Sequence, residues 1–366
     1  MGLGHGEGST RRLLQFCGAY FFFYVITGVA VKYFLSTGMK GIEFLVYSTA
    51  GGSLIVFPIV VAGRWYRLKS NRMTKVAGIS VPSEIAYIIP SGICTAVVIP
   101  TTTLMYTLPI TVMVAMTMMR GSVIVISRCV DAIQIRQGIL HKRVYIEENI
   151  AVVFAIAAVA VHVYFGALLE LPKFIDSTVK PGGGFDFFSD AAAMTIFFSY
   201  ISAYAARIYL MNYFKNTRAK GVKLDNKGFF AIEQFAATGT MLLVFALLLL
   251  AGGEGMRVTL MRGAVNNPVA KWPWAILAGT AFGAAAFFSV FLFMFKGRTA
   301  TFAGLVNRLT SLLAGTVATL IFWFGFDGPR IKIQDVVALG FVLIAVWFLS
   351  RAEKKRAAEL AQESST

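Results

Sequence analysis

The chain has 366 residues, of which 57% are hydrophobic and 14% are charged, and its formal net charge is +16 at pH 7. A mean hydropathy of +0.71 excludes a domain whose main solvent is water. Cys17, Cys94 and Cys129 are too few and too widely spaced for a disulfide framework or a metal cluster, so neither is expected.

Mostly apolar runs recur along the whole chain, each long enough to cross a hydrocarbon core about 30 Å thick. They predict an all-α polytopic membrane protein with ten transmembrane helices. In chain order the predicted spans are 13–36, 41–63, 84–107, 110–130, 147–168, 190–214, 229–251, 272–295, 299–324 and 333–351. The first span follows Arg11 and Arg12 but is too long for a cleaved signal, so we expect it to be retained.

Most of the 34 Lys and Arg residues fall on one side of this series of spans. They lie in the N-terminal segment, in the loops after the second, fourth, sixth and eighth spans, and in the C-terminal tail. The positive-inside rule therefore predicts that both termini are cytoplasmic. Nucleic acid is not needed to explain the excess charge. The host membrane stays open between a bacterial inner membrane and a eukaryotic endomembrane such as Golgi or endoplasmic reticulum.

Two related halves are indicated, residues 1–175 and residues 176–366. At one constant offset Lys32 aligns with Arg207, and after a longer loop in the second half the offset shifts once and Arg120 aligns with Arg308. Five spans per half is an odd number, so the halves would form an inverted repeat, the common architecture of secondary transporters. The alternative is a chance likeness between apolar helices.

Arg120 and Arg308 would lie near the membrane midplane on symmetry-related helices. An arginine at this depth costs about 2.5–3.5 kcal/mol on insertion scales, so it is expected to face a wet cavity. A guanidinium fork fits phosphate or carboxylate oxygens, which predicts a site for an anion. Small and polar neighbours are further candidates for the site: Ser122, Gly304, Asn307 and Thr310. The alternative is an internal ion pair with Glu43, Glu84 or Glu233.

Other polar residues within the spans add to the candidate site. Glu233 and Gln234 would read a polar head group of the solute. Lys32 and Arg207 are candidates as well, although long side chains in the last third of a span can also extend to the interface. The chain has no phosphate-binding loop and no metalloprotease or serine-hydrolase motif, so we expect no enzyme, no cofactor and no metal.

The five-plus-five arrangement resembles the drug/metabolite transporter superfamily, which includes EamA-like and nucleotide-sugar transporters. Residues 304–308, Gly-Leu-Val-Asn-Arg, are similar to the G-A-L-N-K signature of GDP-mannose-type transporters. The resemblance implies that Asn307 and Arg308 contact the sugar and diphosphate of a ligand. Residues 231–234 depart from that family's F-Y-N-N motif. Residues 118–122, Met-Met-Arg-Gly-Ser, look like the M-L-R-G-S segment of the branch containing chloroquine-resistance-type carriers.

These features favour a secondary transporter that moves a small organic anion, such as a nucleotide-sugar or phosphorylated metabolite, by alternating access. Two alternatives are an exporter of amino acids, drugs or other organic cations, and a non-transporting membrane scaffold or receptor. The expected partners are the anionic solute and the lipid bilayer, and a homodimer is left open.

Overall fold

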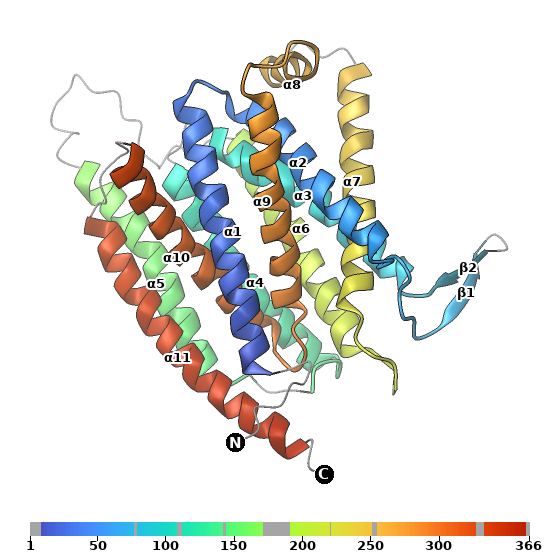
Figure 1. The fold of residues 1–366 in the computed structure, drawn as a ribbon. Coiled ribbons are helices and arrows are strands. Elements are labelled where there is room, and N and C mark those ends of the chain that lie inside the picture. The colour runs from blue at the N-terminus through green and yellow to red at the C-terminus, as the bar shows by residue number, and fades with distance from the viewer. Residues whose placement is uncertain are drawn as a thin grey trace.

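The computed structural model describes residues 9–76, 79–107, 112–141, 144–170, 191–219, 221–250, 255–326 and 333–363. The boundary predicted between the halves, at residues 175 and 176, lies outside these ranges. Within them the chain folds into helices and one short hairpin (Figure 1). The helices are α1 (Thr10–Ser36), α2 (Gly41–Ala62), α3 (Ile85–Thr107), α4 (Val112–Arg136), α5 (Ile146–Glu170), α6 (Ala191–Asn216), α7 (Asn226–Leu250), α8 (Met256–Asn266), α9 (Trp272–Phe293), α10 (Ala300–Phe326) and α11 (Ile333–Glu363).

Every predicted span coincides with one of these helices, and α8 is the additional one. Within the described ranges, seven helices are long and apolar enough to cross a membrane. They lie in α1, α2, α3, α7, α9, α10 and α11. The protein is therefore an all-α, multi-pass membrane protein. Leu242 and Leu243 of α7, for example, are 62% and 61% exposed, as expected for side chains that face lipid.

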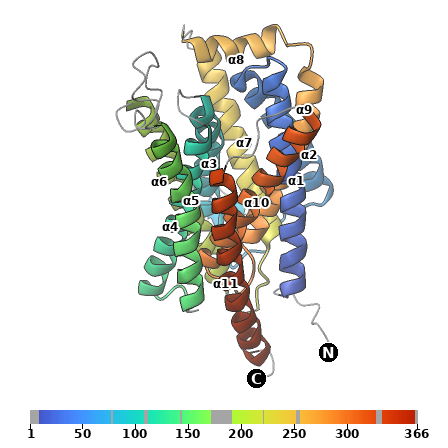
Figure 2. The same ribbon diagram turned by 90° about the vertical axis from the view of Figure 1, so that its left-hand side faces the viewer.

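The long helices run side by side, with the start of α1 and the end of α11 at the same end of the bundle (Figure 1). This end is called the terminal end below. The short helix α8 lies across the opposite end, here called the α8 end (Figure 2). The hairpin was not expected from the sequence. Its strands β1 (Met73–Val76) and β2 (Ile79–Pro82) pair antiparallel and project from the bundle between α2 and α3.

Glycines allow two helix pairs to approach at backbone distance. A Cβ on Gly279 of α9 would lie 2.3 Å from the Ser48 carbonyl oxygen of α2. A Cβ on Gly92 of α3 would lie 2.6 Å from the Glu233 carbonyl oxygen of α7. Small residues at such crossings replace side-chain packing with backbone contact, which drives helix association in lipid.

Candidate functional site

Arg120 and Arg308 lie on α4 and α10, which pack against each other. Both residues lie more than two turns inside their helices, and both are buried, with 4% and 9% of their surface exposed. Neither guanidinium forms an ion pair with a described carboxylate. The predicted alternative of an internal salt bridge to these two arginines is therefore not found in the described part of the chain.

Each of these arginines lies against a tyrosine of another helix. The Arg120 Cζ lies 5.6 Å from the ring centroid of Tyr24 on α1, and Arg120 Nη2 donates a hydrogen bond of 3.1 Å to the Tyr24 hydroxyl. The Arg308 Cζ lies 4.9 Å from the ring centroid of Tyr204 on α6. A ring face attracts a cation, so each tyrosine ring holds the guanidinium beside it in place.

The tyrosines form two matching pairs. Tyr20 and Tyr24 are one turn apart on α1, with ring centroids 5.4 Å apart and an interplanar angle of 49°. Tyr200 and Tyr204 on α6 have almost the same geometry, 5.3 Å and 48°. All four tyrosines are electrostatic neighbours of the Arg308 guanidinium. These tyrosines were not identified from the sequence, although the Tyr-x-x-x-Tyr spacing occurs at both 20–24 and 200–204 and could have indicated them.

Polar atoms beside Arg308 lack partners. Arg308 Nε and Nη2 are buried and have no hydrogen-bond partner among the described residues, and the same holds for Asn307 Oδ1. The Asn307 amide is fixed in orientation because its Nδ2 donates to Ser289 Oγ at 2.9 Å. Two donor nitrogens of Arg308 and one acceptor oxygen of the adjacent Asn307 thus lack a partner among the described residues. Unmet buried polar groups are costly, and a ligand with complementary groups would remove that cost.

Arg207 has different surroundings. Its Nε and Nη2 bond the two carboxylate oxygens of Glu233 on α7, at 2.9 and 3.1 Å. Ser91 and Thr95 of α3 also donate to this carboxylate, at 2.7 and 3.2 Å. Glu233 is fully buried, and its bonds to Arg207, Ser91 and Thr95 join α3, α6 and α7. Arg207 therefore does not extend to the membrane interface.

The remaining predicted residues are placed separately. Lys32 donates to Thr319 Oγ1 of α10 at 2.8 Å, whereas Arg207 bonds Glu233 of α7. Ser122 Oγ bonds the Met119 carbonyl of its own helix at 2.8 Å. Gly304 lets α10 approach α4, because a Cβ there would lie 2.3 Å from Ser127 Oγ. Thr310 and Gln234 are half-buried. Of the predicted residues, Arg120 and Arg308 thus share Tyr20 and Tyr24 as neighbours, and Asn307 precedes Arg308 on α10.

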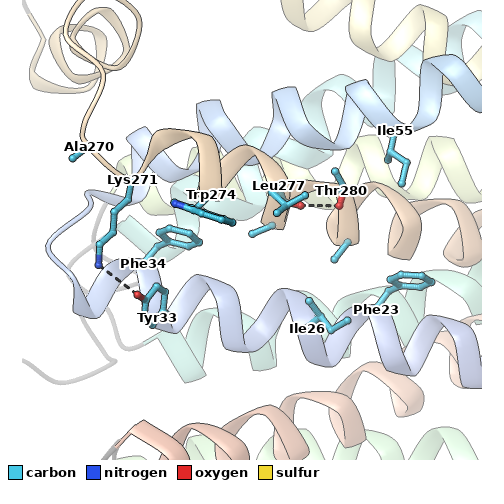
Figure 3. A pocket seen from close by; sticks show the side chains of 12 residues that line it. Phe23, Ile26, Tyr33, Phe34, Ile55, Ala270, Lys271, Trp274, Leu277 and Thr280 are labelled. Atoms are coloured by element: carbon cyan, nitrogen blue, oxygen red, sulfur yellow. Dashed lines mark hydrogen bonds between the residues drawn. The ribbon is translucent and has the colours of Figure 1, made fainter.

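A cavity of about 670 Å³ lies elsewhere, between α1, α2 and α9 (Figure 3). Its apolar lining includes Phe23, Phe34, Trp274 and Leu277. None of the predicted site residues lines it. The arginine cluster and this cavity are therefore distinct features.

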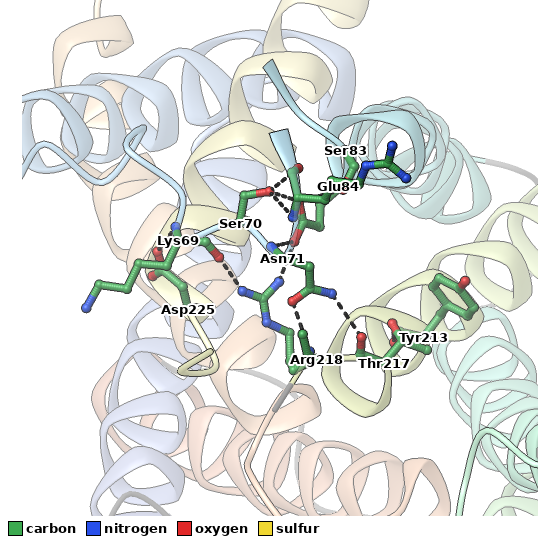
Figure 4. A network of polar contacts seen from close by, with 11 residues as sticks. Lys69, Ser70, Asn71, Ser83, Glu84, Tyr213, Thr217, Arg218 and Asp225 are labelled. Carbon is green, nitrogen blue, oxygen red and sulfur yellow. Dashed lines mark hydrogen bonds and ion pairs between the residues drawn. The ribbon is translucent and has the colours of Figure 1, made fainter. Parts of the chain in front are cut away.

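At the terminal end, a polar network joins residues before the predicted boundary to residues after it (Figure 4). Glu84, just before α3, accepts hydrogen bonds from Ser70 Oγ at 2.5 Å, from Asn71 N at 2.6 Å and from Arg218 Nη1 at 2.7 Å. Burial opposes the charged form of Glu84. The hydrogen bonds from Asn71 and Ser70, together with the Arg218 charge, outweigh burial, so the pKa of Glu84 lies below its ordinary value.

Further bonds across the predicted boundary occur at the same end. Asp131 of α4 accepts the backbone N–H groups of Ala300 and Thr301 at 2.8 and 2.6 Å, and so caps the start of α10. Glu148 of α5 accepts a hydrogen bond of 2.8 Å from Thr299 Oγ1. These bonds join residues before the predicted boundary to residues after it at the terminal end of the bundle.

Comparisons with known proteins concern the fold. No protein-family model matches the chain, and no curated protein matches its sequence. Chains of solved structures do match, 18 in all, and one of them, described only as a protein, has a TM-score of 0.54. That similarity covers 94% of this chain and 100% of that chain at 13% sequence identity. A likeness at this identity carries the fold alone, so the site is interpreted from its own geometry.

Proposed function

We propose that the chain is a secondary membrane transporter that binds a small organic anion between its two halves and moves it by alternating access. The observation that carries the proposal is that buried Arg308 Nε and Nη2, and Oδ1 of the adjacent Asn307, have no hydrogen-bond partner in the described part of the chain. Oxygens of an anion would accept from Arg308, and a hydroxyl of the same solute would donate to Asn307. A phosphorylated metabolite or a nucleotide-sugar has both groups.

Arg120 supplies the second cation of the proposed site. It comes from the other half of the chain, and its charge is not compensated by a described carboxylate. An anion held by Arg120 and Arg308 would contact both halves at once, as a transported solute must when the two halves rock around it. The drug/metabolite transporter resemblance of residues 304–308 favours the same class of solute.

The packing of the helices supports an inverted repeat of ten membrane-crossing helices, with halves at 1–175 and 176–366. In such a repeat the long helices α1, α2, α3, α4 and α5 correspond in order to α6, α7, α9, α10 and α11. The contact of α1 with α9 then corresponds to that of α6 with α3, and both pairs are in contact. The same holds for α2 with α9 and α7 with α3, and for α1 with α10 and α6 with α4. The two glycine crossings, at Gly279 and Gly92, are exchanged as well.

The bonds at the terminal end support alternating access. If the basic loops are cytoplasmic, as the positive-inside rule indicates, this conformation is closed toward the cytoplasm. Opening on that side would break the hydrogen bonds from Arg218 to Glu84 and from the start of α10 to Asp131. Release of these bonds would then be a step of the transport cycle.

The cation-export alternative would use Glu43 and Glu233 as the binding charges. The Glu233 carboxylate already accepts hydrogen bonds from Arg207, Ser91 and Thr95. Glu43 accepts the Lys40 backbone N–H at 2.8 Å, at the start of α2. The described geometry therefore favours an anion.

A ligand panel tests the proposal. Purified protein would be heated with sugar phosphates, nucleotide-sugars, amino acids and amines, and its unfolding temperature recorded. We expect stabilisation by phosphorylated anions, lost in Arg308→Ala and kept in Arg136→Ala, an exposed arginine of α4. Stabilisation by amines, or an equal response of Arg308→Ala and the unmodified chain, would contradict the proposal.

A further inference from the structure

The cavity between α1, α2 and α9 has a polar end and an apolar body (Figure 3). Lys271, just before α9, and Tyr33 of α1 lie at the α8 end, where Lys271 Nζ donates to the Tyr33 hydroxyl at 3.4 Å. Toward the other end the lining consists of apolar side chains such as Phe23 and Ile55. Thr280 is the exception, but its hydroxyl bonds the Leu277 carbonyl at 2.7 Å. The cavity therefore suits an amphiphile with one charged end.

The charge at the polar end is positive and accessible. Lys271 is exposed and forms no ion pair with a described residue; its ammonium lies 5.1 Å from the ring centroid of Tyr33. Trp274, one turn into α9, is 66% exposed at the same end. Lysine and tryptophan at a helix end mark the headgroup level of a bilayer. The group bound there would be anionic and interfacial.

The length of the cavity matches one leaflet. Its lining residues along the start of α9 run from Lys271, just before the helix, to Ala281, which at 1.5 Å per residue is roughly 15 Å. Half of a hydrocarbon core about 30 Å thick has the same depth. The cavity also opens sideways, since Leu277 in its wall is 57% exposed.

From these observations we propose that the cavity is a binding site for one phospholipid of the leaflet at the α8 end. An acyl chain lies along Phe34, Leu277 and Phe23, and the phosphate is bound by Lys271. A polar solute does not fit, because the body of the cavity offers no free donor or acceptor among its described lining groups. The site is separate from the proposed anion site and does not depend on transport.

Native mass spectrometry of protein released from mild detergent tests this site. The probe is a phospholipid added at a fixed ratio to delipidated protein. Leu277→Trp would fill the cavity, and Leu243→Trp is its control, a comparably exposed leucine on α7 outside the cavity. Lys271→Ala removes the charge, and Lys40→Ala is its control, an exposed lysine at the same end.

We expect one retained phospholipid per chain in the unmodified protein and in both controls. Leu277→Trp and Lys271→Ala should each retain at least fivefold less. Equal retention by Leu277→Trp and Leu243→Trp would overturn the assignment of the acyl chain. Equal retention by Lys271→Ala and Lys40→Ala would overturn the assignment of the phosphate.

Discussion

The buried arginines of this protein are of two kinds, distinguished by their partners. Two nitrogens of Arg207 donate to the Glu233 carboxylate, which also accepts hydrogen bonds from two hydroxyl groups of α3. Arg308 lies over the ring of Tyr204, and its Nε and Nη2 have no hydrogen-bond acceptor in the described part of the chain. Loss of one partner in the first arrangement would leave a buried, uncompensated charge, whereas the second arrangement already carries a cost that a bound anion would relieve.

This distinction predicts opposite effects on stability. Glu233→Gln leaves Arg207 as a buried, uncompensated charge and should lower the free energy of unfolding by about 3–5 kcal/mol. Arg308→Gln removes an uncompensated charge and should leave the stability of the anion-free protein unchanged or raise it. Thermal unfolding in detergent measures both. A loss in Arg308→Gln as large as that in Glu233→Gln would assign Arg308 a structural role.

The ring of Tyr204 predicts a second contrast. Tyr204→Ala removes the face below the Arg308 guanidinium and should weaken anion binding by about 0.5–2 kcal/mol. Tyr204→Phe keeps the ring and should bind the anion as the unmodified protein does. Calorimetric titration with the best anion of the ligand panel measures the difference. Equal affinities of the Ala and Phe variants would show that the ring does not position Arg308.

The position of Arg120 and Arg308 well inside long helices could be predicted from the sequence, because it follows from their position within apolar runs. Their tyrosine partners could not, because Tyr24 and Tyr204 lie on helices far away in the chain. The sequence alignment of Lys32 with Arg207 carried no such information, and the two side chains contact different helices. Contacts between helices depend on which faces meet, which hydropathy does not encode.

Among the secondary-structure elements, the long helices could be predicted from hydropathy, whereas the short helix and the hairpin could not. The predicted spans all coincide with helices, because a run of apolar residues at this length has few other stable forms in lipid. Helix α8 and the β1–β2 hairpin are short and partly polar, so a search for spans passes over them. The glycine crossings were also missed, since a glycine at a backbone contact and one facing lipid look alike in the sequence.

The crossing of α2 and α9 makes a prediction of its own. Gly279→Leu would place a side chain against the Ser48 backbone and separate the helices, at a cost of about 1–3 kcal/mol or more. Gly239→Leu on α7 is the matched control, because a Cβ there meets nothing within 4 Å. Unfolding temperatures in detergent compare the two. Equal stability of both variants would contradict the close approach of α2 and α9.

For the molecule as a whole, the network at the terminal end predicts a pH dependence. The pKa of Glu84 is lowered in the folded protein, so its contribution is complete above the ordinary glutamate pKa and is lost as the pH falls through the lowered value. Glu84→Gln should therefore cost about 1.5–3 kcal/mol at pH 7 and less in acid. Thermal unfolding of both proteins across the acid range measures this, and a difference independent of pH would contradict it.

The central claim is that one guanidinium from each half binds the transported anion. The most direct measurement is counterflow of the labelled anion into proteoliposomes, comparing the unmodified protein with Arg120→Ala, Arg308→Ala and the control Arg136→Ala. Loss of a charge-assisted bond of about 1.5–3 kcal/mol predicts that each of the first two variants lowers uptake about tenfold to a hundredfold, with the control unaffected. Unchanged uptake in both Arg120→Ala and Arg308→Ala would contradict the account.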